Sequence, residues 1–156
     1  MVRPFQHESV VKSVSLVLIL FLIVPLEAWA PSHDSPTGLW RTVDDKTHKP
    51  RALIRIYEHA GALSGRIEGS LDPAETKEFC DKCPGELRNK PMVGLVIMHG
   101  MKKQGKEYSG GEILDPDSGR TYSCRMTLAE DGWRLVVRGY LGLSIVGRSQ
   151  VWLRAE

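Results

Sequence analysis

The feature that most constrains the fold is an alternation of apolar and polar residues with a period of two, interrupted at short intervals by glycine and other turn residues. Residues 120–128 show it most clearly, because one face of this segment is apolar and the other is polar. The apolar face carries Tyr122, Cys124, Met126 and Leu128. A period of two is typical of β-strands and not of amphipathic helices. We therefore expect a chain built from short strands.

Eight segments with strand-like patterns follow one another: residues 39–43, 51–58, 62–69, 92–99, 106–114, 120–128, 133–140 and 143–154. Short turns join most neighbours, including Asp115–Gly119 and Asp131–Gly132, so each strand is expected to pair antiparallel with the next. Closure into a barrel would bury the apolar face and remove the exposed strand edges. The sequence predicts an all-β, antiparallel up-and-down barrel of about eight strands. A sandwich of two sheets is the alternative, and the periodicity alone does not separate the two.

One segment favours a helix instead of a strand. Asp72 can serve as an N-cap and Pro73 as the first helical residue, which predicts one short helix ending near Cys80. No internal repeat or second domain is evident, so residues 38–156 are predicted to form a single barrel domain. Residues 31–37 are expected to be a flexible lead-in to it.

The N-terminus, residues 1–30, has the pattern of a secretory signal peptide. A positively charged start precedes an uncharged apolar run over residues 13–26. This run is shorter than the ~20 residues of a membrane-spanning helix, although an uncleaved anchor is the alternative. Cleavage is expected after Ala28 or Ala30. We expect an exported protein, periplasmic or secreted, with no stable membrane span after cleavage.

The charge balance and the motif content exclude several classes of function. The formal net charge is only +2, with both signs interspersed, whereas nucleic-acid binding calls for a clustered basic face. No phosphate-binding glycine loop or nucleophile motif is present, and the histidines are not spaced as a ligand pair. We therefore expect no nucleic-acid partner, no cofactor, no metal and no catalytic residue.

Two residues at the ends of the predicted barrel suggest how it closes. Trp40 lies in "GLW" at the start of the first strand, and Arg154 lies near the end of the last. This resembles the Gly-x-Trp start of lipocalin-like barrels, in which a late arginine stacks on that tryptophan and closes one end. A guanidinium over an indole contributes ~1 kcal/mol or more when it is shielded from water. The alternative is that Trp40 is an ordinary core residue.

The C-terminal half carries longer motifs, "GGEILDPDSGRTYSCRMTL" and "VRGYLGLSIVGRSQVWLR". Together with "GLWRT" and "CDKCPGELRNKPMVGLVIMHGMK", they resemble the bacterial domain-of-unknown-function family 2147. The resemblance implies a β-barrel like those of lipocalins or fatty-acid-binding proteins, and a Gram-negative envelope setting. It implies no established activity, so no catalytic residue is carried over.

Cys80 and Cys83 have a CxxC spacing that serves redox centres, zinc sites and structural disulfides. A redox centre needs a helix that starts at the first cysteine, but a Pro-Gly pair follows Cys83 directly. Structural zinc would need four ligands, and Cys80, Cys83, Cys124 and His99 are the available set. In an oxidising compartment, nearby thiols tend to form a disulfide. We favour a Cys80–Cys83 disulfide with Cys124 buried and reduced; a bridge from either residue to Cys124 is the alternative.

Four polar residues on the last two strands are the candidate ligand contacts: Arg138, Tyr140, Arg148 and Gln150. If their faces point into the barrel, they would hold the carboxylate headgroup of a ligand, for which arginine has suitable bidentate geometry. The alternative is that they point outward while apolar neighbours fill the interior. Those neighbours are Leu135, Val137, Ile145 and Val151.

These observations lead to one functional hypothesis and one alternative. The first is an exported, non-enzymatic barrel that binds a small hydrophobic or amphipathic ligand. The alternative is a filled barrel that acts as an interaction or inhibitor module in the envelope, through the disulfide-clipped loop of residues 70–91. The sequence indicates no particular protein partner, and an enzyme ranks last because no catalytic constellation is present.

Overall fold

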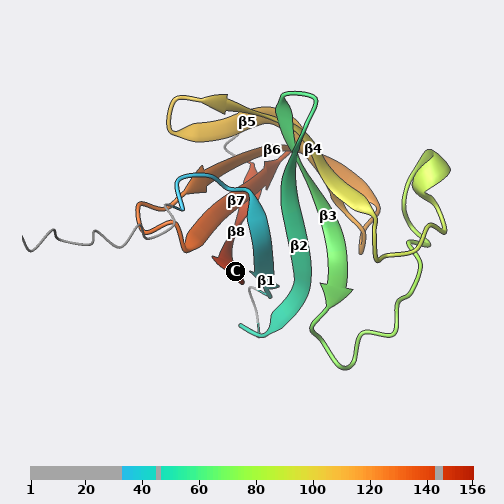
Figure 1. Cartoon of the computed structure of the whole chain (residues 1–156). Coiled ribbons are helices and arrows are strands. Elements are labelled where there is room, and N and C mark those ends of the chain that lie inside the picture. Colours follow the sequence, from blue (N-terminus) through green and yellow to red (C-terminus); the bar gives the residue numbers. More distant parts are fainter. Residues whose placement is uncertain (1–32, 45–46, 143–145) are drawn as a thin grey trace, which may run out of the picture. The chain divides into compact units, whose positions relative to one another are not determined.

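The computed structural model describes residues 33–44, 47–142 and 146–156. Eight strands form a closed barrel in which each strand pairs antiparallel with the next and β8 pairs with β1 (Figure 1). They are β1 Gly38–Val43, β2 Pro50–His59, β3 Ala62–Ser70, β4 Val96–Gln104, β5 Glu107–Asp115, β6 Arg120–Leu128, β7 Arg134–Tyr140 and β8 Gly147–Arg154. The predicted up-and-down barrel is confirmed. The predicted signal peptide lies outside the described residues.

The first and last strands, β1 and β8, close the barrel by pairing over a short stretch. Trp40 pairs with Arg154, and Arg41 pairs with Leu153. These two pairs join the sheet into a ring, which excludes the two-sheet sandwich. Within the described part of the chain, no helix is long and apolar enough to span a membrane.

Apolar side chains from strands around the whole barrel fill its interior. The fully buried ones include Trp40, Ile54, Ile56, Met98, Met101, Cys124, Met126, Leu135 and Trp152. Burial of each such side chain stabilises the fold by ~1.5–3 kcal/mol relative to leaving it exposed. Packing is close enough to require glycine at Gly111, where a Cβ atom would overlap the backbone carbonyl of His99 on the neighbouring strand and crowd Met101 Sδ. An eight-stranded barrel has an interior just wide enough to be filled in this way.

The short helix predicted to begin at Pro73 is not formed. The Asp72 carboxylate accepts a 2.9 Å hydrogen bond from the Ala74 amide, and a backbone bond from Glu75 closes a single turn there. Two helical turns are too few to be stable in isolation. The chain forms a 3-10 turn later instead, η1 (Gly85–Leu87).

The strand predicted at residues 92–99 begins later, because β4 starts at Val96. Before that point the chain still runs beside β3. The Ile67 amide donates to the Leu95 carbonyl at 2.9 Å, and the Gly94 amide donates to the Ile67 carbonyl at 2.8 Å. Of the apolar residues before β4, Leu95 is buried and Met92 packs against the core, whereas Val93 is exposed.

The up-and-down topology separates the connections between two ends of the barrel. The terminal end carries residues 33–37, the C-terminus and the β2–β3, β4–β5 and β6–β7 connections. The loop end carries the other four connections, of which β3–β4 is much the longest. In Figure 1 this β3–β4 connection projects away from the strands. Each end presents a separate candidate site.

Candidate functional site

The terminal end is closed by Arg154 and Trp40. The guanidinium carbon of Arg154 lies 4.3 Å from the centre of the Trp40 ring, as the sequence predicts, and both side chains are buried. Burial lowers the pKa of Arg154 from its ordinary value, because desolvation disfavours the charged form. This stacking contact therefore holds a buried cation inside the barrel end.

Backbone carbonyls complete the coordination of that cation. The Arg154 guanidinium donates to the carbonyls of Gly132, Thr37 and Ser35 at 2.7, 2.8 and 2.7 Å. The indole N–H of Trp40 donates to the Pro36 carbonyl at 2.7 Å. Residues 35–37, in the segment expected to be a flexible lead-in, are thus tied to the barrel. The arrangement is a structural clasp that fixes the N-terminal segment to the last strand.

The four residues predicted to hold a ligand headgroup do not converge. Arg138 and Tyr140 lie on the outer face, because they alternate with the buried Leu135 and Val137. Arg138 donates from Nη1 to the Ser149 hydroxyl at 3.0 Å on that outer face. A single cationic floor built from all four residues is therefore not present.

The other two of the four lie on the inward-facing side of β8. Arg148 and Gln150 alternate with outward-facing residues and share the face of the buried Trp152. The Gln150 side-chain oxygen accepts a 3.2 Å hydrogen bond from the Trp152 indole, while Arg148 is exposed. Val151, expected inside if these residues pointed outward, is itself 45% exposed, and Ile145 lies outside the described residues.

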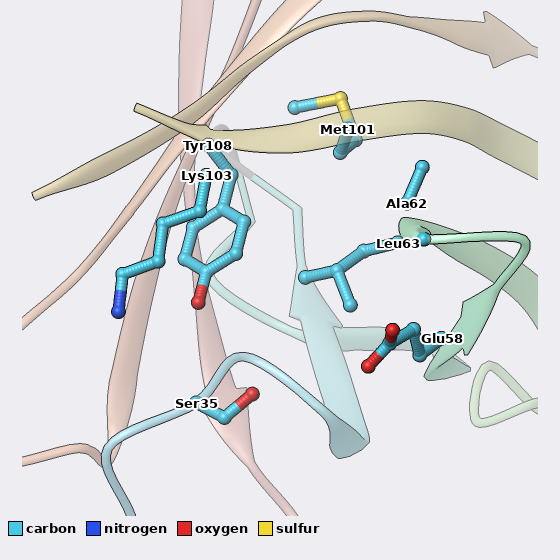
Figure 2. Close-up of a pocket in the computed structure, with 8 residues that line it drawn as sticks. Ser35, Glu58, Ala62, Leu63, Met101, Lys103 and Tyr108 are labelled. Carbon is cyan, nitrogen blue, oxygen red and sulfur yellow. The ribbon is translucent and has the colours of Figure 1, made fainter. Parts of the chain in front are cut away.

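A small pocket of about 220 Å³ opens at the terminal end. It is lined by Ser35, Glu58, Gly61, Ala62, Leu63, Met101, Lys103 and Tyr108. Leu63 and Met101 are buried and give it an apolar floor. Figure 2 shows Lys103 beside Tyr108, with the Glu58 carboxylate on the other side of the pocket. These residues come from the β2–β3 and β4–β5 hairpins and the N-terminal segment, and no sequence motif joins them.

The β3–β4 connection, residues 71–95, is here called the clip loop. Cys80 and Cys83 form a disulfide within it, with their Cα atoms 5.4 Å apart and both residues buried. Since the disulfide uses both thiols, it excludes the zinc set and the bridge to Cys124. A β-bridge pairs Phe79 with Pro91, and the Cys80 amide donates to the Lys90 carbonyl at 2.9 Å. The clip loop is therefore a short antiparallel ribbon closed at its tip.

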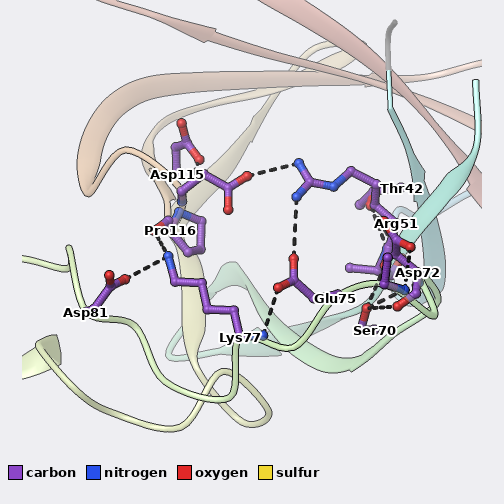
Figure 3. Close-up of polar contacts among 12 residues, drawn as sticks. Thr42, Arg51, Ser70, Asp72, Glu75, Lys77, Asp81, Asp115 and Pro116 are labelled. Carbon is purple, nitrogen blue, oxygen red and sulfur yellow. Dashed lines mark hydrogen bonds and ion pairs between the residues drawn. The ribbon is translucent and has the colours of Figure 1, made fainter. Parts of the chain in front are cut away.

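Ion pairs and hydrogen bonds fasten the clip loop to the barrel (Figure 3). Arg51 on β2 lies between Asp117 in the β5–β6 turn, at 2.9 Å, and Glu75 in the loop, at 3.8 Å. Lys77 donates to the Pro116 carbonyl at 3.1 Å and pairs with Asp81 at 2.8 Å. The hydrogen bond from Lys77 is the main reason that the pKa of Asp81 lies below its ordinary value. The loop is thus held by its base and by its middle.

The outer side of the clip loop exposes apolar residues. Phe79 is 52% exposed and Val93 is 62% exposed. Phe79 and Pro91 lie directly opposite each other in the ribbon, and the exposed Val93 lies next to them in the turn over residues 92–95. We call Phe79, Pro91 and Val93 the apolar face of the clip loop. Exposed apolar residues that lie next to one another are a feature of interaction surfaces, whereas single ones are common on any protein.

The third cysteine, Cys124, is a buried and unreactive thiol. Cys124 is fully buried on the inner face of β6, as predicted, and is reduced. Burial raises the pKa of its thiol to about 12, which suppresses the reactive thiolate at neutral pH. Across the described ranges, no three His, Cys, Asp or Glu side chains are grouped so as to hold a metal ion. Cys124 serves as a small apolar core residue.

Comparison with known proteins places this barrel among bacterial relatives. Residues 38–154 match the family described as "Uncharacterized protein conserved in bacteria (DUF2147)". No curated protein sequence matches the chain significantly. Among solved structures, it is similar to protein HP1028 from Helicobacter pylori, described as belonging to the lipocalin family, with a TM-score of 0.68 and 22% identity over 78% of this chain and 84% of that one. At this identity the likeness shows a lipocalin-like fold alone. The family match covers nearly the whole barrel domain, and the chain therefore belongs to the DUF2147 family of bacterial proteins.

Proposed function

We propose that the protein is an exported, non-enzymatic binding module that engages a protein partner through the apolar face of the clip loop. The observation that carries this proposal is the exposure of Phe79 and Val93 on a ribbon that a disulfide and the Arg51 and Lys77 contacts hold in place. Aromatic residues are enriched in the buried centres of protein interfaces. A preorganised loop also loses less conformational entropy on binding.

The filled interior supports a surface function over an internal one. Ligand pockets in proteins have volumes of roughly 300–1,000 Å³. The interior positions of this barrel are taken by its own side chains, and the pocket at the terminal end has only about 220 Å³. The surface of the clip loop is therefore the better candidate for recognition.

Two observations support location outside the cytoplasm. The N-terminal sequence has the features of a signal peptide, and the Cys80–Cys83 disulfide belongs to a class of bond that persists in oxidising compartments. A periplasmic or secreted location in a Gram-negative bacterium would place the clip loop among envelope proteins.

The double variant Phe79→Ser and Val93→Ser tests the proposed interaction. We expect it to recover at least tenfold less of the specific partner from envelope extract, measured by quantitative mass spectrometry after affinity capture. Its stability should change little, since surface substitutions of this kind are usually within ~0.5 kcal/mol. Val146→Ser, at a 69% exposed valine in the β7–β8 connection, is the matched control. Equal recovery by all three proteins would contradict the proposal.

A second candidate function is the binding of a small amphipathic ligand in the pocket at the terminal end. It is favoured by the combination of an apolar floor, Leu63 and Met101, with the charged rim of Glu58 and Lys103. A ligand that fits about 220 Å³ is smaller than the ligands of usual pockets, which have volumes of roughly 300–1,000 Å³. The lipocalin-like fold is consistent with this function.

Native mass spectrometry of protein isolated from its own envelope tests the second candidate. We expect added mass that is lost on denaturation, and at least tenfold less of it in the double variant Glu58→Gln and Lys103→Gln, which removes both rim charges at nearly constant volume. Lys106→Gln, in the adjacent β4–β5 turn, is the control. A protein without added mass, or one with equal adducts in all variants, would rule out this pocket.

A further inference from the structure

The outer face of the barrel carries a groove that neither proposed function uses. It has a volume of about 420 Å³ and is lined by Glu107, Arg125, Thr127, Val136, Arg138 and Ser149. The four on β6 and β7 lie on the outside because they alternate with buried residues, and Glu107 and Ser149 lie opposite them on β5 and β8. They also form continuous rows across the strands. One row runs across β6, β7 and β8 through Arg125, Arg138 and Ser149. The other runs across β5, β6 and β7 through Glu107, Thr127 and Val136. We call this the outer groove.

The feature that needs explaining is the pairing of two arginines. Side chains directly opposite on neighbouring antiparallel strands have Cβ atoms ~5 Å apart, and like charges in this arrangement are destabilising. Arg138 is oriented by its hydrogen bond to the Ser149 hydroxyl at 3.0 Å. Within the described part of the chain, the Arg125 guanidinium makes no hydrogen bond or ion pair. Two guanidinium groups thus face one groove, and one of them has its donors available.

The other four lining residues indicate which kind of ligand would offset the repulsion between the two arginines. Glu107 is the one acidic residue among the six, so the lining keeps a surplus of one positive charge. Thr127 and Ser149 add hydroxyl groups beside the two arginines, and Val136, 39% exposed, supplies an apolar surface. Guanidinium groups bind phosphate and carboxylate through paired, charge-assisted hydrogen bonds. An oxyanion beside Arg125 and Arg138 would bind the available donors of Arg125 and offset the repulsion between the two guanidinium groups.

We propose that the outer groove binds the phosphate group of a ligand between Arg125 and Arg138, with the apolar part of that ligand on Val136. The site is independent of the clip loop and of the pocket at the terminal end, because it shares no residue with either. The same phosphate chemistry occurs in soluble phosphate esters and in lipid headgroups. The test therefore includes both.

Isothermal titration with inorganic phosphate and with butyl phosphate measures binding at the outer groove. We expect butyl phosphate to bind more tightly than phosphate because of its contact with Val136. Arg125→Gln should weaken both affinities at least tenfold, since it removes one charged, bidentate contact. Glu107→Gln should tighten both severalfold, because it removes the one repulsive carboxylate. Arg120→Gln, on the same strand but outside the groove, should leave both unchanged.

The opposite signs expected for Arg125→Gln and Glu107→Gln separate a binding role from a structural one. Co-sedimentation with vesicles of phosphatidylglycerol, lost in Arg125→Gln, would assign the phosphate to a lipid headgroup. Butyl phosphate binding without vesicle binding would assign it to a soluble ligand. Absence of binding to both phosphate probes, or equal affinities in wild type and Arg125→Gln, would overturn the proposal. The Phe79→Ser and Val93→Ser variant should bind butyl phosphate normally, so failure of the clip-loop function would be distinguishable.

Discussion

Replacing Arg154 with methionine is expected to lower the free energy of unfolding by about 4 kcal/mol. The substitution removes the cation over Trp40, worth ~1–2 kcal/mol once desolvated. It also leaves the carbonyls of Gly132, Thr37 and Ser35 without their donor, and a buried acceptor left unpaired costs ~1–3 kcal/mol. Methionine has a similar length, so the loss of packing is small.

Urea denaturation followed by tryptophan fluorescence measures this loss. Arg134→Met is the control, because the Arg134 guanidinium is exposed and pairs with Asp131 on the surface at 3.0 Å. Such pairs contribute ~1 kcal/mol or less. If the two variants lose equal stability, the clasp at the terminal end is not a main source of the stability of the barrel.

Replacing Gly119 with alanine is expected to detach the clip loop from the barrel. Gly119 has φ +72° in the β5–β6 turn, and a Cβ atom there would overlap the backbone carbonyl of Lys82. A backbone atom cannot move aside as a flexible side chain would, so the loop must shift. We expect a loss of stability of about 2–3 kcal/mol, from the left-handed backbone and the overlap together.

Hydrogen exchange of backbone amides measures where this effect falls. The amides of Cys80, Asn89 and Met92, which bond within the clip loop, should lose at least tenfold in protection. Gly105→Ala is the matched control, since Gly105 has φ +65° in a turn but no atom lies within 4 Å of its Cβ position. Equal effects of the two alanines would mean that the loop does not rest on the β5–β6 turn. If Gly119→Ala also loses partner capture, the contact between the clip loop and the β5–β6 turn is needed for the proposed interaction.

The fold could be predicted because its signals are local. The alternation in residues 120–128 places Cys124 and Met126 inside, and turns such as Asp131–Gly132 join neighbouring strands. The disulfide was also predictable, because the sequence predicts export and a CxxC pair tends to oxidise in oxidising compartments. The position of the short helical turn was not, since an N-cap and a proline alone do not sustain a two-turn helix.

The sites depend on which face of a strand points inward, and the sequence is ambiguous there. On β7, Arg138 shares its face with the apolar Val136, whereas on β8, Arg148 shares its face with the buried Trp152. Composition therefore gives no clear inner face for either strand, and the predicted group of four is divided by the barrel wall. The outer groove could be predicted only from the pairing register of β6, β7 and β8. The pocket at the terminal end could be predicted only from knowing that the β2–β3 and β4–β5 hairpins lie side by side. Both are properties of the closed barrel.

The clasp at the terminal end also sets the order in which the barrel can be completed. Arg154 holds the carbonyls of Thr37 and Ser35, which lie 117 and 119 residues earlier in the chain. The segment before β1 is therefore fixed by a residue of β8. Contacts between residues this far apart in the chain form late, because the intervening chain must first be ordered. During synthesis from the N-terminus, the barrel stays open until β8 is available to pair with β1. The clasp thus forms only at the end of folding, because its guanidinium donor lies on the last strand and its carbonyl acceptors precede the first.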